Sequence, residues 1–495
     1  MAKNGKTVTA LADLVTGTVV GTGEASVDDV THDSRQAGPG TLFVAIRGES
    51  VDGHVFAATA AKAGASALCV DHEVDVDVPQ IVVGDTREVI GDLAAAVHDY
   101  PSTALDVIGV TGTNGKTTVT HYVDSIARHV GRVTGLVGTI HTRSAGSSRP
   151  ATLTTPEAPD FQRLLAGMRD DGVDLVATEV SSHALAFGRV RGTRFAVAAF
   201  TNLSQDHLDF HGDMAAYEKA KRRLFTDYEV GTAVINIDDE VGARIAADYP
   251  GALLTVGQGG DFAVHGVETR RTRTVFTFDW PEGSTRLEAP VIGGFNVSNL
   301  AVAAACCVAV GIDHDDIVDA MAEVEGVPGR FEVVSGEDPI TVIVDYAHTP
   351  EGVATAVATG RRLTGGRVIA LIGAGGDRDR AKRPAMGAAI SSADLAVVTS
   401  DNPRSEDPAA IAAAVMSGVD PGADHILELD RRLGIDLAIG SAQDGDVVLI
   451  LGRGHEPMQD WGGSRVPFDD RQVAAESLRR RRSTESDGEW GSMSP

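Results

Sequence analysis

An apolar run at residues 105–110 leads directly into a glycine- and threonine-rich loop and then into a helical pattern at residues 117–129. Backbone N–H groups and the helix N-terminus of such a strand–loop–helix unit can bind phosphate. The spacing departs from the strict phosphate-loop pattern because position 110 is Val, and a glycine-rich turn with an incidental lysine is the alternative. We predict a phosphate site in which Lys116 neutralises charge and the Thr117 hydroxyl ligates Mg²⁺. The loop consists of Gly112, Thr113, Asn114, Gly115, Lys116, Thr117 and Thr118.

The rest of the chain alternates strand-like apolar runs with helical stretches, which is typical of α/β proteins with a largely parallel sheet. At roughly 150 residues per domain, 495 residues indicate about three domains. We predict strands at 41–46 and 67–70 around a helix at 56–65, then at 173–180, 195–200 and 232–237, and a new series at 341–344, 368–372, 395–399 and 447–451. The predicted α/β domains are 1–103, 104–332 and 333–478, followed by a disordered tail at 479–495.

Each of the last four predicted strands runs into a polar or glycine-rich segment. Ligands of open α/β sheets bind at the carboxyl ends of the strands. These ends should therefore share one edge of the sheet and line a single cleft. The segments are 345–349, 373–379, 400–404 and 452–456.

Charge and composition exclude several kinds of partner and compartment. The 70 acidic and 43 basic residues give a net charge of −27, which disfavours nucleic acid and anionic membrane surfaces as general partners. Three cysteines, Cys69, Cys306 and Cys307, form no disulfide framework or metal-binding pattern. No run of about 18 uncharged apolar residues occurs, so we expect no membrane span and a cytoplasmic protein.

Two stretches of the middle section carry possible metal ligands. Glu179 ends a predicted strand, where it could hold a cation bound with a nucleotide, although a solvated acid is the commoner reading of such a residue alone. Residues 200–213 are dense in His, Asp and Asn. The pair His207 and His211 suits a ligand pair and a hydrogen-bonding network equally well. By composition, the following Lys219 and Lys221 are ordinary surface charges.

The predicted cleft of the last section holds groups that suit an amino acid. Asp401, Asn402, Pro403 and Arg404 follow a strand, and an arginine fixed in such a turn can clasp a carboxylate through two hydrogen bonds. An ordinary turn with a solvated arginine is the alternative. Glu456 follows another strand and can accept an ammonium group. An arginine and a glutamate across one cleft fit a zwitterion.

Taken in order, from residues 33–35 to 468–471, these stretches resemble the Mur ligase superfamily, and most closely its members that add the third residue of the peptidoglycan stem peptide. The resemblance implies a UDP-binding N-terminal domain, a central ATP-binding domain and a C-terminal Rossmann-like domain that receives the amino acid. It implies that ATP phosphorylates the D-glutamate carboxylate of UDP-MurNAc-L-Ala-D-Glu and that diaminopimelate attacks the acyl phosphate. The implied partners are small molecules only, and we expect a monomer.

The resemblance also assigns roles to individual residues. It adds Asn299, Arg330, Asp345 and His348 to the loop at 112–118 as ATP contacts. It gives Mg²⁺ the ligands Thr117, Glu179, His207 and Lys221, the last as a carbamate, which reverses the reading of Lys221 as a surface charge. The residues that it assigns to the UDP-linked dipeptide are His32, Ser34, Thr154, Thr155, Ser182 and Arg189. Those that it assigns to diaminopimelate are Arg378, Asp401, Asn402, Pro403, Arg404, Gly452 and Glu456.

The intact motif at 401–404 marks members of the superfamily that choose diaminopimelate over lysine. Diaminopimelate offers Arg404 a second carboxylate, whereas lysine would leave that arginine unpaired. Three positions depart from the common pattern. Phe187 stands where some members have Gln, Ala374 where Cys is common, and Arg453 where Lys is usual.

Two other functions compete with this interpretation. A folylpolyglutamate synthase or another Mur enzyme is disfavoured by the motif at 401–404, the stretch at 154–157 and the domain that precedes the phosphate loop. A nucleotide-binding scaffold that has lost ligation is disfavoured because Lys116, Glu179, His207 and Lys221 are all retained.

Overall fold

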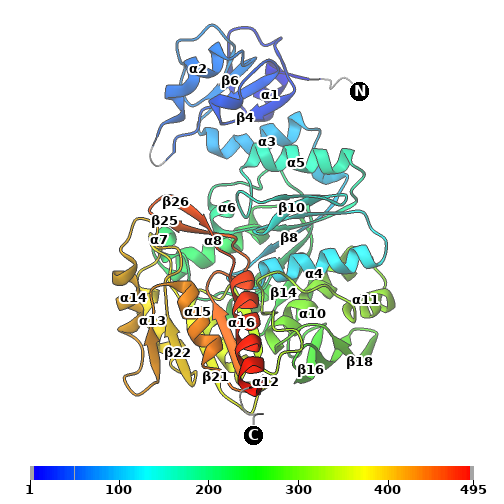
Figure 1. Ribbon diagram of the computed structural model, residues 1–495. Coiled ribbons are helices and arrows are strands. Elements are labelled where there is room, and N and C mark those ends of the chain that lie inside the picture. Colours follow the sequence, from blue (N-terminus) through cyan, green and yellow to red (C-terminus); the bar gives the residue numbers. More distant parts are fainter. Residues whose placement is uncertain (1–4, 49–50, 491–495) are drawn as a thin grey trace.

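The apolar runs of the sequence form the inner strands of three separate sheets in the computed structural model, which describes residues 5–48 and 51–490 (Figure 1). Parallel strands covered on both faces read as continuous apolar runs, and this is why the sequence locates them well. Four predicted strands have the bounds that the structure gives them: β6 (Ala67–Val70), β13 (Phe195–Phe200), β21 (Val368–Ile372) and β24 (Val447–Leu451).

The N-terminal domain is built on a five-stranded sheet in the order β2-β7-β6-β5-β4, beside a small β1–β3 ladder. The helix predicted at 56–65 is shorter and starts as a 3₁₀ turn. The elements are β1 (Lys6–Thr7), α1 (Val8–Leu14), β2 (Thr18–Val20), β3 (Ser26–Val27), β4 (Asp29–Thr31), η1 (Ser34–Gln36), β5 (Thr41–Val44), η2 (Gly53–Phe56), α2 (Ala57–Lys62), β7 (Gln80–Val82), α3 (Thr86–Val97) and η3 (Pro101–Thr103).

The central domain contains an eight-stranded sheet in the order β11-β10-β9-β12-β8-β13-β14-β15, which is parallel from β9 to β15, as predicted. The antiparallel hairpin β10–β11 extends one edge. The elements are β8 (Asp106–Thr111), α4 (Lys116–His129), β9 (Thr134–Val137), β10 (His141–Ser144), β11 (Ser147–Pro150), α5 (Ala158–Asp170), β12 (Leu175–Glu179), α6 (Ser182–Ala186), α7 (Leu208–His211), α8 (Met214–Thr226), β14 (Val230–Asn236), α9 (Glu240–Asp248) and β15 (Ala252–Val256).

A three-stranded antiparallel sheet that the sequence analysis did not predict follows the central sheet. It consists of β16 (Ala263–Thr269), β17 (Thr274–Trp280) and β18 (Gly283–Ala289). The helix α10 (Gly294–Ala309) packs against β16 and α4 and buries both Cys306 and Cys307, and α11 (His314–Met321) follows it. An apolar helix of this kind must be covered on all sides, which explains why this extra sheet is present.

The C-terminal domain has a six-stranded sheet in the order β19-β20-β24-β21-β22-β23. Strands β20, β24, β21 and β22 run parallel, so their carboxyl ends lie at one edge, as predicted. The remaining elements are β19 (Glu332–Val333), β20 (Thr341–Asp345), α12 (Pro350–Leu363), α13 (Lys382–Ile390), β22 (Leu395–Val398), α14 (Pro408–Met416), β23 (His425–Leu427), α15 (Arg431–Gly440), β25 (Met458–Trp461), β26 (Ser464–Pro467) and α16 (Asp470–Trp490).

The prediction of a disordered tail from residue 479 is wrong as far as residue 490, because α16 continues to Trp490. The sequence there lacks an apolar period, but its arginines contact the C-terminal domain. Arg480 pairs with Asp436, and Arg482 pairs with Asp338 at 2.7 Å. Ion pairs and main-chain contacts therefore hold the helix at residues 480–482 in place of an apolar face. Residues 491–495 lie outside the described residues.

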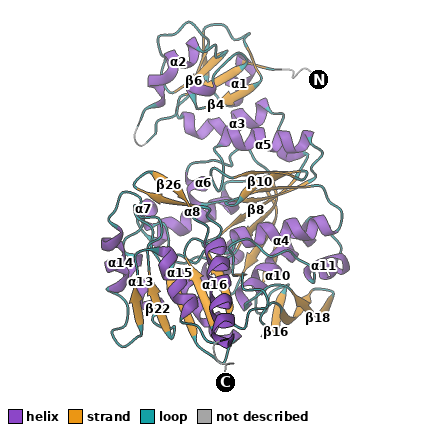
Figure 2. Cartoon of the chain, viewed as in Figure 1, coloured by secondary structure: helices purple, strands orange, loops and turns teal. Residues whose placement is uncertain are grey.

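The N-terminal domain stands at one end of the molecule and meets the central domain where α3 packs on α5 (Figures 1 and 2). Asp29 on β4 joins the two domains, since it accepts hydrogen bonds from Arg163 on α5 at 3.1 Å. The central and C-terminal domains lie side by side at the other end. Within the described ranges, no helix has both the length and the apolar character needed to cross a bilayer.

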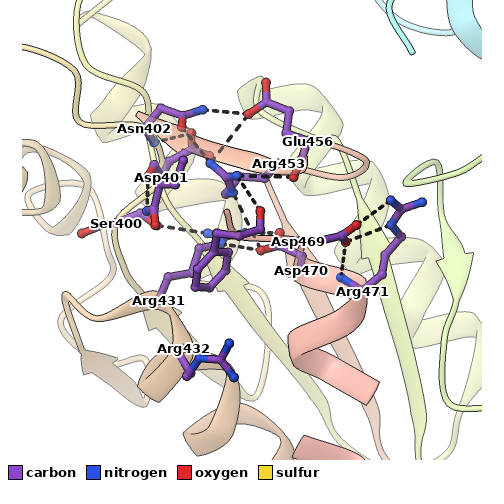
Figure 3. Close-up of polar contacts among 12 residues, drawn as sticks. Ser400, Asp401, Asn402, Arg431, Arg432, Arg453, Glu456, Asp469, Asp470 and Arg471 are labelled. Atoms are coloured by element: carbon purple, nitrogen blue, oxygen red, sulfur yellow. Dashed lines mark hydrogen bonds and ion pairs between the residues drawn. The ribbon is translucent and has the colours of Figure 1, made fainter. Parts of the chain in front are cut away.

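A fully buried ion pair joins two helix starts in the C-terminal domain. Arg431 begins α15 and Asp470 begins α16, and their side chains meet at 2.6 Å with no exposed surface (Figure 3). Arg431 also donates to the main-chain carbonyls of Ser400 and Leu451. The pair therefore ties the last helix to the strand ends of the sheet.

We predict that Arg431→Met lowers the free energy of unfolding of this domain by about 3–5 kcal/mol, because Asp470 becomes a buried charge that has lost its closest partner. The control is Arg432→Met, which removes the exposed ion pair to Glu476 and a guanidinium 6.0 Å from the centre of the Phe468 ring, and should cost at most about 1 kcal/mol. Denaturant titration followed by circular dichroism measures both. Equal losses in the two variants would contradict the role of the buried pair.

Candidate active site

A cleft of about 570 Å³ lies between the central and C-terminal domains. Its walls are the loops that follow β8, β12 and β13 on one side and β20, β21, β22 and β24 on the other. Most of the predicted ATP, metal and amino-acid residues line it together: Thr113, Asn114, Gly115, Lys116, Thr117, Thr118, Glu179, His207, Asn299, Arg330, Asp345, His348, Arg378, Asp401, Asn402, Arg404, Gly452 and Glu456.

The predicted phosphate loop follows β8, and α4 begins at Lys116. Gly112 and Gly115 have φ angles of 147° and 89°, which side chains rarely allow. A Cβ atom at Gly115 would also lie 2.4 Å from the side-chain oxygen of Asn299. Lys116 donates from Nζ to the carbonyls of Gly112 and Thr113, both at 2.9 Å. The loop is therefore a tight turn with its lysine folded over it, at the N-terminus of a helix.

The Glu179 carboxylate lies beside this loop, buried at the end of β12. It accepts hydrogen bonds from the Thr117 hydroxyl at 3.0 Å and from the Thr139 amide at 2.7 Å. Arg330 reaches across from the start of the C-terminal domain and donates to the same Thr117 hydroxyl at 2.9 Å. The predicted cation ligands Thr117 and Glu179 thus touch each other directly.

The sequence did not decide whether His207 and His211 are a ligand pair or part of a hydrogen-bonding network. In the structure the two histidines have different surroundings. His207 lines the cleft next to Asp206, and burial lowers the pKa of His207 to about 3, so its ring is neutral. His211 instead forms a hydrogen bond between Nε2 and the Ser182 hydroxyl at 3.0 Å. Of the two histidines, only His207 lies where it could coordinate a cation in the cleft.

Lys221 is buried behind the phosphate loop and is not a surface charge. Its Nζ donates to the Gly112 carbonyl at 2.6 Å and lies 4.5 Å from the centre of the Tyr217 ring. Burial and the nearby charge of Lys116 together lower the pKa of Lys221 well below its ordinary value. Within the described residues, no ion pair joins Lys221 to a carboxylate. A neutral amine is the form that can react with carbon dioxide.

The amino-acid residues predicted from the sequence meet in the C-terminal half of the cleft. Asn402 donates from Nδ2 to Glu456 at 2.7 Å, and Arg404 donates to the Gly376 carbonyl at 2.5 Å. Burial and the charge of Asp401 raise the pKa of Glu456, whereas Arg453 and Asn402 act in the opposite direction. Pro403 is buried in the same turn but does not line the cleft.

The residues predicted for the UDP-linked dipeptide are spread more widely. Thr154 lines the cleft, whereas Thr155, Ser182 and Arg189 lie just behind it, Thr155 donating to the Glu179 carbonyl at 2.8 Å. Arg189 pairs with Glu157 at 2.8 Å. His32 and Ser34 belong to the N-terminal domain and are outside the cleft lining.

The Phe187 position, noted as a departure from the family pattern, has a structural role here. Its ring lies 5.0 Å from the guanidinium of Arg87, on α3 of the N-terminal domain, and 5.6 Å from that of Arg189. A cation above the face of an aromatic ring is attracted to that ring. Phe187 therefore links two arginines from different domains, a contact that a glutamine could not make in this way.

Three features of the site were missed from the sequence. Lys382 on α13 forms a buried ion pair with Asp206 of the central domain at 3.0 Å. Arg453, noted only as a departure, is completely buried beneath Asn402. The hairpin β25–β26 also pairs with the turn at 401–404 through Asp460 and Arg404. A single lysine or arginine carries no sequence signal for burial, so no pattern in the sequence pointed to Lys382 or Arg453.

Comparison with known families gives three matches along the chain. The Mur ligase middle domain matches residues 110–307, the glutamate ligase domain of Mur ligases matches 329–454, and the catalytic domain of the Mur ligase family matches 26–98. They follow one another in the order of the three domains described above.

Curated proteins and solved structures agree with these matches. A UDP-N-acetylmuramoyl-L-alanyl-D-glutamate–2,6-diaminopimelate ligase of Geobacillus kaustophilus is 44% identical over 93% of this chain and 96% of its own, and one of Streptomyces coelicolor is 40% identical over 95% and 97%. A solved structure of an enzyme of that name is 31% identical, with a TM-score of 0.70 over 97% of this chain and 99% of the other. With its cleft and all three of its domains accounted for, the chain belongs to the Mur ligase family.

Proposed function

We propose that this chain is the ATP-dependent ligase that joins diaminopimelate to UDP-MurNAc-L-Ala-D-Glu in peptidoglycan precursor synthesis. One observation carries the proposal: a single cleft combines a phosphate loop and its acid partner from one domain with an arginine–asparagine–glutamate pocket from the next. The relatives named above carry this activity in their names and match the chain over nearly its full length.

The residues present fit a divalent cation bound with ATP. Thr117, Glu179 and His207 offer a hydroxyl, a carboxylate and a neutral ring nitrogen at one wall of the cleft. We propose that Lys221 adds a carbamate, because an unpaired buried amine next to Lys116 is costly as a cation. Such a cation would offset the charge that gathers on the phosphates during transfer.

The chain's own residues act one after another on the three substrates. The loop amides and Lys116 bind the phosphates and hold the terminal phosphate toward the dipeptide carboxylate. That carboxylate oxygen attacks phosphorus, ADP leaves, and the substrate carboxyl becomes an acyl phosphate with a good leaving group. Across the cleft, Glu456 binds one ammonium group of the amino acid. The other amino group, after it has lost a proton to solvent, attacks the acyl carbon; the C–N bond forms as the C–O bond to phosphate breaks, and phosphate and the second amine proton leave.

Specificity for diaminopimelate rests on Arg404 and its neighbours. Arg404 has a φ of 51°, so its backbone is held in a strained form by the hairpin β25–β26, whose Gly462 amide donates to the Arg404 carbonyl at 2.7 Å. A guanidinium fixed this way suits a second carboxylate on the substrate, which lysine lacks. The proposed substrates are small molecules of the cytoplasm. Because one chain supplies the whole cleft, we propose that it acts as a monomer.

The experiment that tests this function supplies the purified chain with ATP, UDP-MurNAc-L-Ala-D-Glu and a panel of diamino acids, and identifies products by mass. We expect phosphate release only when both the dipeptide and diaminopimelate are present. A parallel reaction that contains a folate and glutamate in place of the dipeptide and diamino acid tests the alternative, and a product there would favour a folylpolyglutamate synthase. ATP binding without any product would favour a scaffold.

We predict that Lys221→Ala lowers kcat by about 10²-fold or more, because the anionic ligand is lost from the phosphate-transfer site. The matched control is Lys219→Ala, two positions earlier on α8 and exposed, which should keep normal turnover. Nuclear magnetic resonance with isotopically labelled bicarbonate should detect a carbamate in the wild type and in the control only. Normal turnover by a folded Lys221→Ala protein would refute the carbamate role.

We predict that Arg404→Ala lowers the preference for diaminopimelate over lysine by about 10- to 100-fold, the effect of losing one charged hydrogen-bond pair. Competition between the two amino acids, with products resolved by mass, measures the ratio of kcat/KM values. Arg380→Ala serves as the control, because Arg380 is exposed and pairs with Glu406 outside the cleft lining. An unchanged ratio in Arg404→Ala would argue against the clasp.

A further inference from the structure

One buried arginine next to the proposed amino-acid pocket has no part in the mechanism described so far. Arg453 follows β24 and has no exposed surface. It donates from Nη1 to the side-chain oxygen of Asn402 at 2.8 Å, and from Nη2 to the carbonyls of Met458 at 2.9 Å and Phe468 at 3.1 Å. Its guanidinium thus reaches three separate segments of the C-terminal domain.

The contact to Asn402 fixes which way that amide faces. The Asn402 oxygen accepts from Arg453 and from the Asp460 amide at 2.9 Å, and both of these groups are donors. The Asn402 nitrogen must therefore point the other way, where it donates to Glu456 at 2.7 Å. Figure 3 shows Arg453 between Asn402 and Glu456 on one side and Asp470 on the other. A flipped Asn402 would turn its oxygen toward the Glu456 carboxylate, which is repulsive.

The charges around Glu456 give Arg453 a second effect on the pocket. The pocket holds the carboxylates of Asp401 and Glu456 close together, and Tyr346 and His348 face Glu456 from the loop after β20. Arg453 lies 3.7 Å from Glu456. Burial and Asp401 raise the pKa of Glu456, while the charge of Arg453 and the hydrogen bond from Asn402 lower it. Arg453 therefore favours the ionised form of a carboxylate that has to accept an ammonium group.

We propose that Arg453 is a positioning residue of the amino-acid pocket: through Asn402 it orients Glu456 and keeps it ready to bind the substrate ammonium. This inference rests on the pocket assignment under the proposed function. Arg453 does not line the cleft, so it acts through its neighbours and not on the substrate.

A lysine at position 453 could make only part of these contacts. The planar guanidinium sends one N–H to Asn402 and others to the carbonyls of Met458 and Phe468, whereas an ammonium is a compact point charge. The asparagine contact is the part that orients Glu456. A lysine that reaches Asn402 should therefore preserve much of the pocket, and an uncharged side chain should not.

The test compares Arg453→Met with Arg453→Lys in steady-state kinetics, with each of the three substrates varied in turn. We expect Arg453→Met to raise KM for diaminopimelate by about 10- to 100-fold, as for the loss of a charged hydrogen bond, with KM for ATP and for the dipeptide substrate nearly unchanged. Arg453→Lys should recover most of that loss. Arg432→Met is the matched control, since Arg432 does not line the cleft and pairs with Glu476 on the surface. Figure 3 shows the Arg432 side chain apart from Asn402 and Glu456.

A pH profile separates positioning from simple loss of structure. Without Arg453, the pKa of Glu456 rises further, so the ratio of KM values between Arg453→Met and wild type should grow as the pH falls and shrink as it rises. The same ratio for Arg432→Met should stay near one throughout. If Arg453→Met fails to fold, Arg453→Lys still decides the matter: it should show a smaller KM increase of a few-fold, again confined to diaminopimelate and larger at low pH.

Two results would overturn the inference. One is an unchanged KM for diaminopimelate in folded Arg453→Met or, failing that, in Arg453→Lys. The other is a parallel rise in KM for all three substrates, which indicates a general loss of structure. Failure of the proposed function looks different, because the wild-type chain itself would then form no product from diaminopimelate.

Discussion

The ion pair between Asp206 and Lys382 crosses from the central domain to the C-terminal domain inside the cleft, and the site depends on it. Asp206 also faces His348 at 3.4 Å. Burial raises the pKa of Asp206, but His348 and Lys382 outweigh burial and hold it below its ordinary value. Neither domain alone contains a complete site. The contact brings the strand ends of two sheets to face each other, so that the loop at 112–118 and the turn at 401–404 line one cleft.

The same arrangement gives a reason for the two domains to move. A substrate of the size proposed here needs room to enter, whereas phosphate transfer and amine attack need water kept out. A pair such as Asp206 and Lys382 can hold a closed form and can be hydrated when the domains separate. Arg330 has a related position, since it sits at the domain junction and touches Thr117 of the phosphate loop. The contact between Arg330 and Thr117 therefore links the position of the C-terminal domain to the loop at 112–118.

Sequence patterns predicted the parts of the molecule that depend on local order. Buried parallel strands such as β21 and β24 are continuous apolar runs, and the loop at 112–118 has its own signature, so both could be located without a structure. The antiparallel strands β16–β18 are partly exposed and lack such runs. The helix at residues 480–482 was missed because its arginines pair with residues distant in sequence, such as Asp436 and Asp338. Local reading cannot detect partners at such a separation.

The buried cations illustrate this limit most clearly. The chain has far fewer basic than acidic residues, and it buries several of the basic ones, among them Lys382, Arg431 and Arg453. Each contacts main-chain carbonyls or a carboxylate from a segment distant in sequence, so each joins segments that the fold brings together. Burying a charge is unfavourable unless it is paired or hydrogen-bonded. When several segments together supply the partners of one buried cation, that cation is stabilised only in the fold in which all of those segments are in place. Such residues can define the geometry of a pocket without lining it.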